Sequence, residues 1–202
     1  MEPTEHNRRA FDELQRARRR ARAGLPPIVK STLGDLTGKR VLHLGCRSGE
    51  ASAELAEAGA VVTAVDSSEK LLDEARERWP KILWIHAEAD ALPGELRRGR
   101  FDLVYSPEGV IGSLADLDVW TQGLVDALHP RGELLVYDDH PVAFCVDRLH
   151  RWHGDYFAEG LWRLGRIVTT VAGAGFRLEA LEEYPGERRL PGTFLLYARL
   201  EG

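Results

Sequence analysis

The sequence is short of several residue types, and each shortage excludes a class of protein. Its 202 residues include two cysteines, Cys46 and Cys145, which are too few for a disulfide framework and too far apart for a zinc knuckle. No apolar run approaches the roughly 18 residues of a membrane-spanning helix, and the first residues lack the apolar core of a secretory signal. We therefore expect a cytoplasmic protein that holds no metal.

Lysine, asparagine and glutamine are also scarce. Four of the 27 basic residues are lysine, and the chain has one asparagine and two glutamines. A GC-rich bacterial genome produces this composition, and so does the avoidance of heat-labile residues in a thermophile. The sequence does not separate the two causes.

The charge is unevenly distributed along the chain. The formal net charge is -5, yet residues 1–30 carry eight basic residues against four acidic ones. Residues 4–23 contain no glycine or proline and favour a helix with an arginine-rich face, so we interpret residues 1–37 as an N-terminal helical cap. An arginine cluster at 8–22 could contact RNA or DNA, but the acidic balance of the whole chain favours a solvated helix or a lid over a cofactor.

From residue 40 onward, short apolar runs alternate with amphipathic stretches. The pattern predicts strands at 41–44, 61–65, 82–85, 101–105 and 133–137, and helices at 50–58, 67–79, 115–128 and 166–174. Ser67 is the expected N-cap of the second of these helices. Such alternation is typical of an α/β domain, here residues 38–202, with a mostly parallel sheet between two helical layers.

The end of the chain departs from this alternation. Residues 140–165 are rich in histidine and aromatic side chains and show no strand–helix period. Two further strands, at 176–183 and 193–200, are separated by a loop with proline and glycine and are expected to form an antiparallel pair.

The segment 41–50 contains the most informative motif. It reads VLHLGCRSGE, which predicts a strand, a tight turn at Gly45 and the start of a helix after Gly49. Asp66 follows the next strand, about 20 residues later, where an acid can hold the two hydroxyls of a ribose. The G-x-G-x-x-G pattern of dinucleotide enzymes is absent.

The order of five motifs resembles the class I S-adenosylmethionine-dependent methyltransferases. The family's V-L-D-L-G-C-G-T-G appears as VLHLGCRSG, and its ribose acid corresponds to Asp66. The remaining three are EADALP at 88–93, FDLV at 101–104 and LHPRG at 128–132. The resemblance implies a Rossmann-like three-layer sandwich with a seven-stranded sheet whose last strand is antiparallel, and S-adenosylmethionine as cofactor.

The resemblance also assigns the cofactor site. Asp66 would hold the ribose, Gly45 and Gly49 the methionyl side, and Glu88 with Ala89 the adenine edge. The complete set is His43, Gly45, Cys46, Arg47, Gly49, Asp66, Ser67, Glu88, Ala89 and Ser106. We interpret Cys46 itself as a packing residue.

Two positions depart from the family pattern. His43 stands where the family usually has an acid for the methionine ammonium, and Arg47 replaces the middle glycine. Arg47 can clash with the cofactor, turn outward, or pair with the methionine carboxylate. Two functions therefore remain open: methyl transfer, and a degenerate fold that serves as a binding module.

The acceptor is expected to be a small molecule, because a chain this compact has no separate domain for a macromolecule. His140, after the fifth strand, is the candidate general base, although it could equally cap a helix end. Residues 140–165 are a candidate substrate lid, with plain hydrophobic packing as the alternative. His150 and His153 supply too few ligands for zinc. An RNA methyltransferase that uses the arginine helix and a homodimer both remain open.

Overall fold

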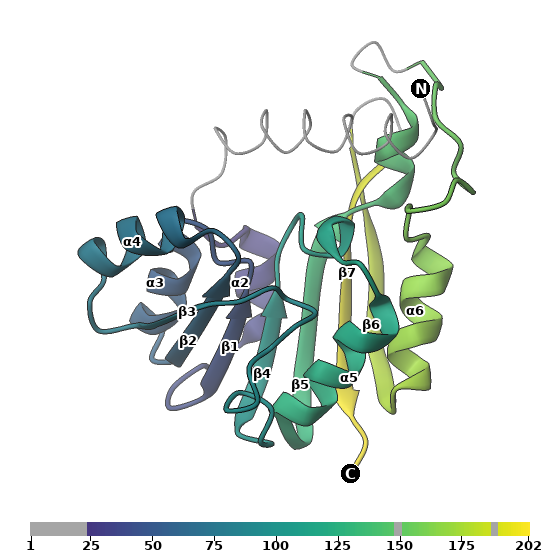
Figure 1. Ribbon diagram of the computed structural model, residues 1–202. Coiled ribbons are helices and arrows are strands. Elements are labelled where there is room, and N and C mark those ends of the chain that lie inside the picture. The colour runs from purple at the N-terminus through teal and green to yellow at the C-terminus, as the bar shows by residue number, and fades with distance from the viewer. Residues whose placement is uncertain (1–23, 148–150, 187–189) are drawn as a thin grey trace.

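The computed structural model describes residues 24–147, 151–186 and 190–202 (Figure 1). The expected helix at 4–23 lies outside the described residues. The helices are α2 (Pro27–Leu33), α3 (Glu50–Glu57), α4 (Glu69–Arg78), α5 (Leu117–Ala127) and α6 (Leu164–Gly173), with 3-10 turns η1 (Ile111–Ser113) and η2 (Pro141–Cys145). The strands are β1 (Arg40–Leu44), β2 (Val61–Asp66), β3 (Leu83–His86), β4 (Phe101–Ser106), β5 (Leu128–Asp139), β6 (Phe176–Pro185) and β7 (Pro191–Leu200).

The strands form one sheet in the order β3-β2-β1-β4-β5-β7-β6. Strands β1 to β5 are parallel, and β7 is antiparallel to both of its neighbours, β5 and β6. This arrangement confirms the predicted mostly parallel seven-stranded sheet. Because β1 pairs with β2 on one side and β4 on the other, the loops after these three strands meet at one edge.

The sheet separates two apolar clusters, which confirms the three-layer prediction. Side chains of α5 and α6 pack with Leu42 and Leu44 on one face, whereas those of α2, α3 and α4 pack with Val41 on the other. Figure 1 shows the two helical layers on opposite sides of the sheet. Strands buried on both faces read as continuous apolar runs, which is why they could be located from sequence.

Several predicted boundaries were wrong. Ser68 rather than Ser67 is the N-cap of α4: its Oγ accepts from the Leu71 N–H, and Asp66 already holds the Ser68 N–H. The helix α2 was not predicted separately: it begins at Pro27, a position where a missing N–H costs nothing.

Strand β5 is longer than predicted. The strand was predicted at 133–137 but begins at Leu128, so the LHPRG motif at 128–132 lies within it and coincides with a register shift. Arg131 lies in this irregular stretch with φ 68°, a conformation that favours glycine. The sequence motif therefore marks a bulge inside a strand.

Residues 24–37, the described part of the expected cap, pack into the core of the domain. Leu25, Val29, Leu33 and Leu36 are all buried in the cluster beneath α3 and α4. Burying such side chains stabilises the fold by about 2 kcal/mol each. No helix in the three described ranges has the length and apolar character needed to cross a bilayer.

Candidate active site at the carboxyl edge of the sheet

Asp66, at the end of β2, holds the two loops on either side of it. Its Oδ2 accepts from the Arg47 N–H at 2.7 Å and its Oδ1 from the Ser68 N–H at 2.9 Å. Each carboxylate oxygen can accept a further hydrogen bond. The acid predicted to hold a ribose therefore lies beside the glycine loop, as that prediction requires.

Arg47 crosses the edge from β1 toward β4. Its backbone has φ 53°, which is costly for a residue with a side chain and suits the glycine usual at this position. Its Nη2 donates to the carbonyl oxygen of Glu108, in the loop after β4, at 2.6 Å. A cationic guanidinium thus lies between the ends of β1 and β4.

His43 is buried and neutral at the end of β1. Its Nδ1 lies 2.7 Å from Ser52 Oγ on α3, and its ring stacks on Tyr105 at 5.0 Å between centroids. Burial, aided by the positive charge of Arg47, lowers the pKa of His43 to about 3. Its Nε2 is buried without a hydrogen-bond partner in the described part of the chain.

The two glycines of the loop are required by packing. A Cβ at Gly45 would lie 2.6 Å from Val110 Cγ2, and one at Gly49 would lie 2.6 Å from Trp84 Cη2. Both glycines have positive φ. The loop is therefore pressed against the β4–η1 connection on one side and against β3 on the other.

Asp138, at the end of β5, organises the loop after β4. Its carboxylate accepts from the N–H groups of Gly109 at 2.6 Å, Ile111 at 2.8 Å and Asp139 at 2.7 Å. Burial raises the pKa of Asp138 to about 7, although the N–H bonds from Gly109 and Ile111 act in the opposite direction. Asp138 was not among the predicted site residues; the signal that could have found it is an acid directly after the apolar run at 133–137.

The remaining predicted cofactor residues lie along the same edge. Ser106 is fully buried at the end of β4, and its Oγ has no hydrogen-bond partner within residues 24–147, 151–186 and 190–202. Ser67 and Glu88 are exposed after β2 and β3, and Ala89 packs against the core beside them. The topology therefore brings the predicted set to the ends of β1, β2, β3 and β4.

His140 uses both ring nitrogens within the chain. Nδ1 accepts from the Val142 N–H at 3.1 Å, so Nε2 carries the proton and faces Glu183 Oε1 at 2.9 Å. Burial lowers the pKa of His140, and this outweighs the opposing effect of Glu183. The ring caps η2, and the candidate base is neutral and engaged.

Burial disfavours the thiolate form of both cysteines. Burial raises the pKa of Cys46 far above its ordinary value and raises that of Cys145 to about 11. Cys46 packs in the cluster beneath α3, as predicted. His150 lies outside the described residues, and the part of the chain that is described contains no group of three or more potential metal ligands.

The described parts of the segment expected to form a lid have no regular secondary structure except the 3-10 turn η2 and the first residues of α6. Trp162 ties it to the core: its Nε1 donates to the Leu114 carbonyl oxygen at 3.0 Å. Trp152 and Phe157 are exposed, and Arg163 lies over the Phe157 ring. Trp162 therefore anchors the segment to the core, whereas Trp152 and Phe157 are exposed to solvent.

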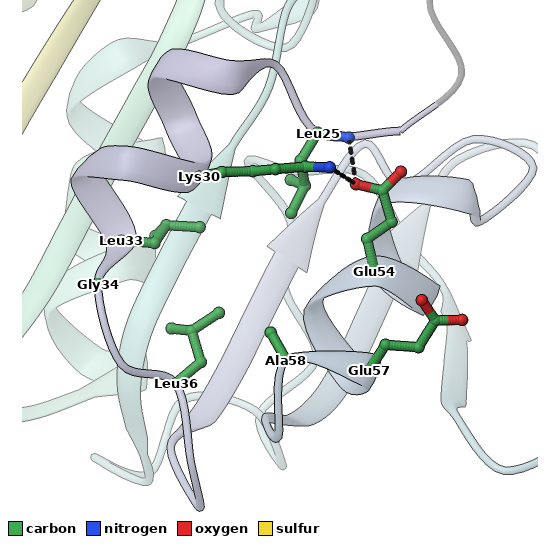
Figure 2. Close-up of a pocket in the computed structure, with 8 residues that line it drawn as sticks. All are labelled: Leu25, Lys30, Leu33, Gly34, Leu36, Glu54, Glu57 and Ala58. Carbon is green, nitrogen blue, oxygen red and sulfur yellow. Dashed lines mark hydrogen bonds and ion pairs between the residues drawn. The ribbon is translucent and has the colours of Figure 1, made fainter.

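A pocket of about 270 Å³ lies elsewhere, between α2 and α3 (Figure 2). Figure 2 shows the Leu25 N–H and Lys30 Nζ converging on one carboxylate oxygen of Glu54, at 3.1 Å and 2.8 Å. The pocket is lined by Leu25, Lys30, Leu33, Gly34, Leu36, Glu54, Glu57 and Ala58. None of these residues belongs to the carboxyl edge, so the pocket is not the predicted cofactor site.

Comparison with known proteins finds similarity to methyltransferases. Residues 41–132 match the family model described as "Methyltransferase domain". A structure of an S-adenosylmethionine-dependent methyltransferase from Mesorhizobium loti is 26% identical, with a TM-score of 0.74, over 86% of this chain and 96% of that one. Residues 41–132 thus match a methyltransferase domain, and the described fold is similar to that of the S-adenosylmethionine-dependent methyltransferase from Mesorhizobium loti.

Two named relatives are similar over part of the chain. The ubiquinone biosynthesis O-methyltransferase of Aromatoleum aromaticum is 44% identical over 73 residues, which are 34% of this chain and 31% of that protein. The magnesium-protoporphyrin O-methyltransferase of Rhodobacter capsulatus is 34% identical over 109 residues, 50% and 48% of the two chains. The chain spans about a third to a half of the length of these curated relatives.

Proposed function

We propose that the protein transfers a methyl group from S-adenosylmethionine to a small-molecule acceptor. The observation that carries the proposal is the convergence of Asp66, the Gly45–Gly49 loop and Ser106 at one edge of a methyltransferase-type sheet. Two partial relatives named as O-methyltransferases act on small molecules, which supports an acceptor of that class.

The two halves of the cofactor fit the site differently. On the adenosine side, Asp66 retains acceptor capacity for ribose hydroxyls, and Glu88 and Ala89 follow β3 where the adenine edge is expected. On the methionyl side, a neutral His43 and the cationic Arg47 replace the acid and glycine of the family pattern. When bound, the cofactor supplies an electrophilic methyl group on a sulfonium.

The contribution of the protein to such a reaction is positioning and the exclusion of water. We place the acceptor next to residues 140–147 and 151–165, which follow the carboxyl end of β5 and are anchored by Trp162. His140 can take a proton from an acceptor hydroxyl at Nδ1 only after the hydrogen bond from the Val142 N–H opens, because Nε2 already carries a proton. Its role as general base is part of this proposal.

Two measurements test the proposal. Isothermal titration of the full chain with S-adenosylhomocysteine is expected to show saturable binding in the micromolar range. Transfer of radiolabelled methyl to small phenols and carboxylic acids is then compared with transfer to bulk RNA. Absent or millimolar binding of both S-adenosylhomocysteine and S-adenosylmethionine would refute the enzyme assignment.

A second candidate function is a binding module that has lost methyl transfer. Arg47 and His43 favour it, because both change the end of the site next to the reacting sulfur. The double variant Arg47→Gly, His43→Asp separates the two functions. Cofactor binding by the variant alone would show that the natural site is degenerate, whereas binding by the natural chain favours the enzyme.

An RNA acceptor is the remaining alternative. The arginine cluster at 8–22 that would contact RNA lies outside the described residues. RNA contact predicts an affinity that falls steeply with salt. Removal of residues 1–23 should then abolish that affinity, and unchanged RNA binding after the removal would exclude the cluster as the contact.

A further inference from the structure

The pocket between α2 and α3 lies apart from the proposed cofactor site, and the proposed function makes no use of it. Figure 2 shows the side chains of Leu33, Leu36 and Ala58 directed toward one space, which Leu25 also lines. A Cβ at Gly34 would meet no atom within 4 Å, so this residue leaves room on its side. The volume of about 270 Å³ exceeds the roughly 150 Å³ of an apolar cavity that holds benzene, so a phenyl ring fits.

An ion pair forms one charged part of the lining, and its two charges offset each other. Lys30 Nζ lies 2.8 Å from Glu54 Oε2, and the same oxygen accepts from the Leu25 N–H at 3.1 Å (Figure 2). Glu54 Oε1 accepts no hydrogen bond from the part of the chain that the structure describes. Glu54 therefore keeps one carboxylate oxygen for a donor on a ligand.

Glu57 gives the lining an excess of negative charge. It lies three residues after Glu54, so the two carboxylates extend from the same face of α3. Glu57 is exposed and has no hydrogen-bond or ion-pair partner within residues 24–147, 151–186 and 190–202. The two glutamates and Lys30 together give the lining a formal net charge of -1. The last turn of α3 holds no basic residue, and its carbonyl groups add partial negative charge, so the pocket favours a cation.

We propose that this pocket binds a small primary amine with an apolar body of about six to nine heavy atoms. The leucine side chains contact the body, and the ammonium lies on the α3 side, where Glu54 and Glu57 accept its hydrogen bonds. An ammonium has three N–H donors and no acceptor, so it matches carboxylates. A ligand carboxylate would instead meet two like charges beside one lysine. The site is independent of the cofactor assignment.

Three probes that share a phenyl ring and differ in charge test the proposal: 2-phenylethylamine, 2-phenylethanol and phenylacetate. NMR titration of the full chain, labelled at its leucine methyl groups, measures both the affinity and the place of binding. The amine is expected to shift the signals of Leu25, Leu33 and Leu36 with a dissociation constant of about 1 mM or below. The alcohol should bind about threefold more weakly and the carboxylate about tenfold more weakly, because exposed charges contribute modestly. Equal or tighter binding of phenylacetate, or leucine signals that the amine leaves unchanged, would overturn the inference.

Two substitutions assign the binding to this pocket. Ala58→Leu places a larger side chain in the space, at a helix cap with φ -76°, and should weaken amine binding about tenfold or more. Ala172→Leu is its matched control, because Ala172 is also exposed near the end of a helix, on α6, outside the pocket. Glu57→Gln should abolish most of the preference for the amine over the alcohol, whereas Glu77→Gln, near the end of α4, should leave it unchanged.

Substitution of Lys30 tests the charge preference in the opposite direction. Lys30→Met keeps an unbranched side chain but removes the cation that competes for Glu54, so the amine should bind about twofold to threefold more tightly. Weaker amine binding by this variant would overturn the assignment of a cation to the pocket. None of these measurements depends on S-adenosylhomocysteine, so the amine site and the proposed methyl transfer can each fail alone.

Discussion

At the scale of single residues, the cofactor loop combines a conserved geometry with altered chemistry. Gly45 and Gly49 keep the positive φ values that let the loop turn and pack closely. Arg47 adopts a positive φ as well, so the glycine-like backbone persists although the residue is an arginine. The loop therefore has a backbone shape that suits glycine at three positions, one of which carries a charged side chain.

The packing role of Gly45 can be measured by adding one methyl group. Gly45→Ala is expected to destabilise the fold by about 2–4 kcal/mol, because the Cβ meets Val110 Cγ2 and the backbone has positive φ. Urea unfolding provides the measurement. Gly34→Ala, with φ 61° and open space around the added Cβ, reports the backbone cost alone.

A second substitution tests the proposed clash directly. Val110→Ala removes the methyl group that Gly45→Ala meets, so the double variant should recover part of the loss. Additive effects of the two substitutions would contradict a steric role for Gly45.

The neutrality of His43 predicts a specific spectrum. Because burial lowers its pKa to about 3, the ring should keep one protonated nitrogen from pH 8 down to pH 5. Long-range proton–nitrogen correlation spectra report this directly, and His43→Gln identifies the signal. A His43 signal that shifts to the doubly protonated form within that range would disprove the buried, neutral assignment.

At the scale of elements, carboxylates at strand ends hold the functional loops by their N–H groups. Asp66 holds residues 47 and 68, and Asp138 holds residues 109, 111 and 139. Asp90 likewise accepts from the Ala115 N–H, ahead of α5. A loop fastened in this way keeps its shape without regular secondary structure, which positions side chains such as Arg47.

The titration of Asp138 makes the stability of the fold depend on pH. Its pKa is about 7 in the fold against 3.8 ordinarily, so the folded state binds the proton more tightly and this contribution to stability falls as pH rises from about 4 to about 7. Between pH 5 and pH 8 the loss amounts to about 2–3 kcal/mol.

The variant Asp138→Asn does not titrate and should lack this decline, although it is less stable at every pH because an N–H loses its acceptor. Urea unfolding at pH 5 and pH 8 gives the comparison. The destabilisation relative to the natural chain is expected to be larger at pH 5. Equal destabilisation at the two pH values would show that Asp138 is ionised throughout.

At the scale of the whole molecule, the positions of the central strands could be predicted because their causes are local, and the resemblance implied a seven-stranded sheet with an antiparallel last strand. Val41–Leu44 and Val61–Val65 are largely apolar runs, which indicate buried strands. The glycine motif between them can be recognised from a few consecutive residues. The bulge at Arg131 and the contact from Arg47 to Glu108 could not be predicted, because each depends on a strand or loop far away in the sequence. Tertiary partners set both.

An ion-pair cluster also connects distant parts of the sheet. Glu133 on β5 accepts from Lys39 Nζ, just before β1, at 2.9 Å and from Arg199 Nη2 on β7 at 3.1 Å, and its side chain is 17% exposed. Glu133→Gln should lower the free energy of unfolding by about 1–2 kcal/mol in urea titrations, since two cations lose a largely buried partner.

A surface pair provides the control. Asp73→Asn on α4 removes a carboxylate that is 65% exposed and contacts Arg76, and it should change stability by less than about 0.5 kcal/mol. If both substitutions lower the free energy of unfolding by the same amount, the ion pairs of Glu133 stabilise the sheet no more than an exposed surface pair does.

The position of β7 has a consequence for synthesis on the ribosome. β6 is made before β7 but pairs with no strand except β7, which itself lies between β5 and β6 within the described sheet. Residues 176–185 therefore have no place in the sheet until residues near 200 have left the exit tunnel, and β5 presents an open edge during that interval. The nascent chain can form the carboxyl edge of β1, β2, β3 and β4 before β7 is made. Until β7 pairs with β5, the free edge of β5 is open to association with strands of other molecules.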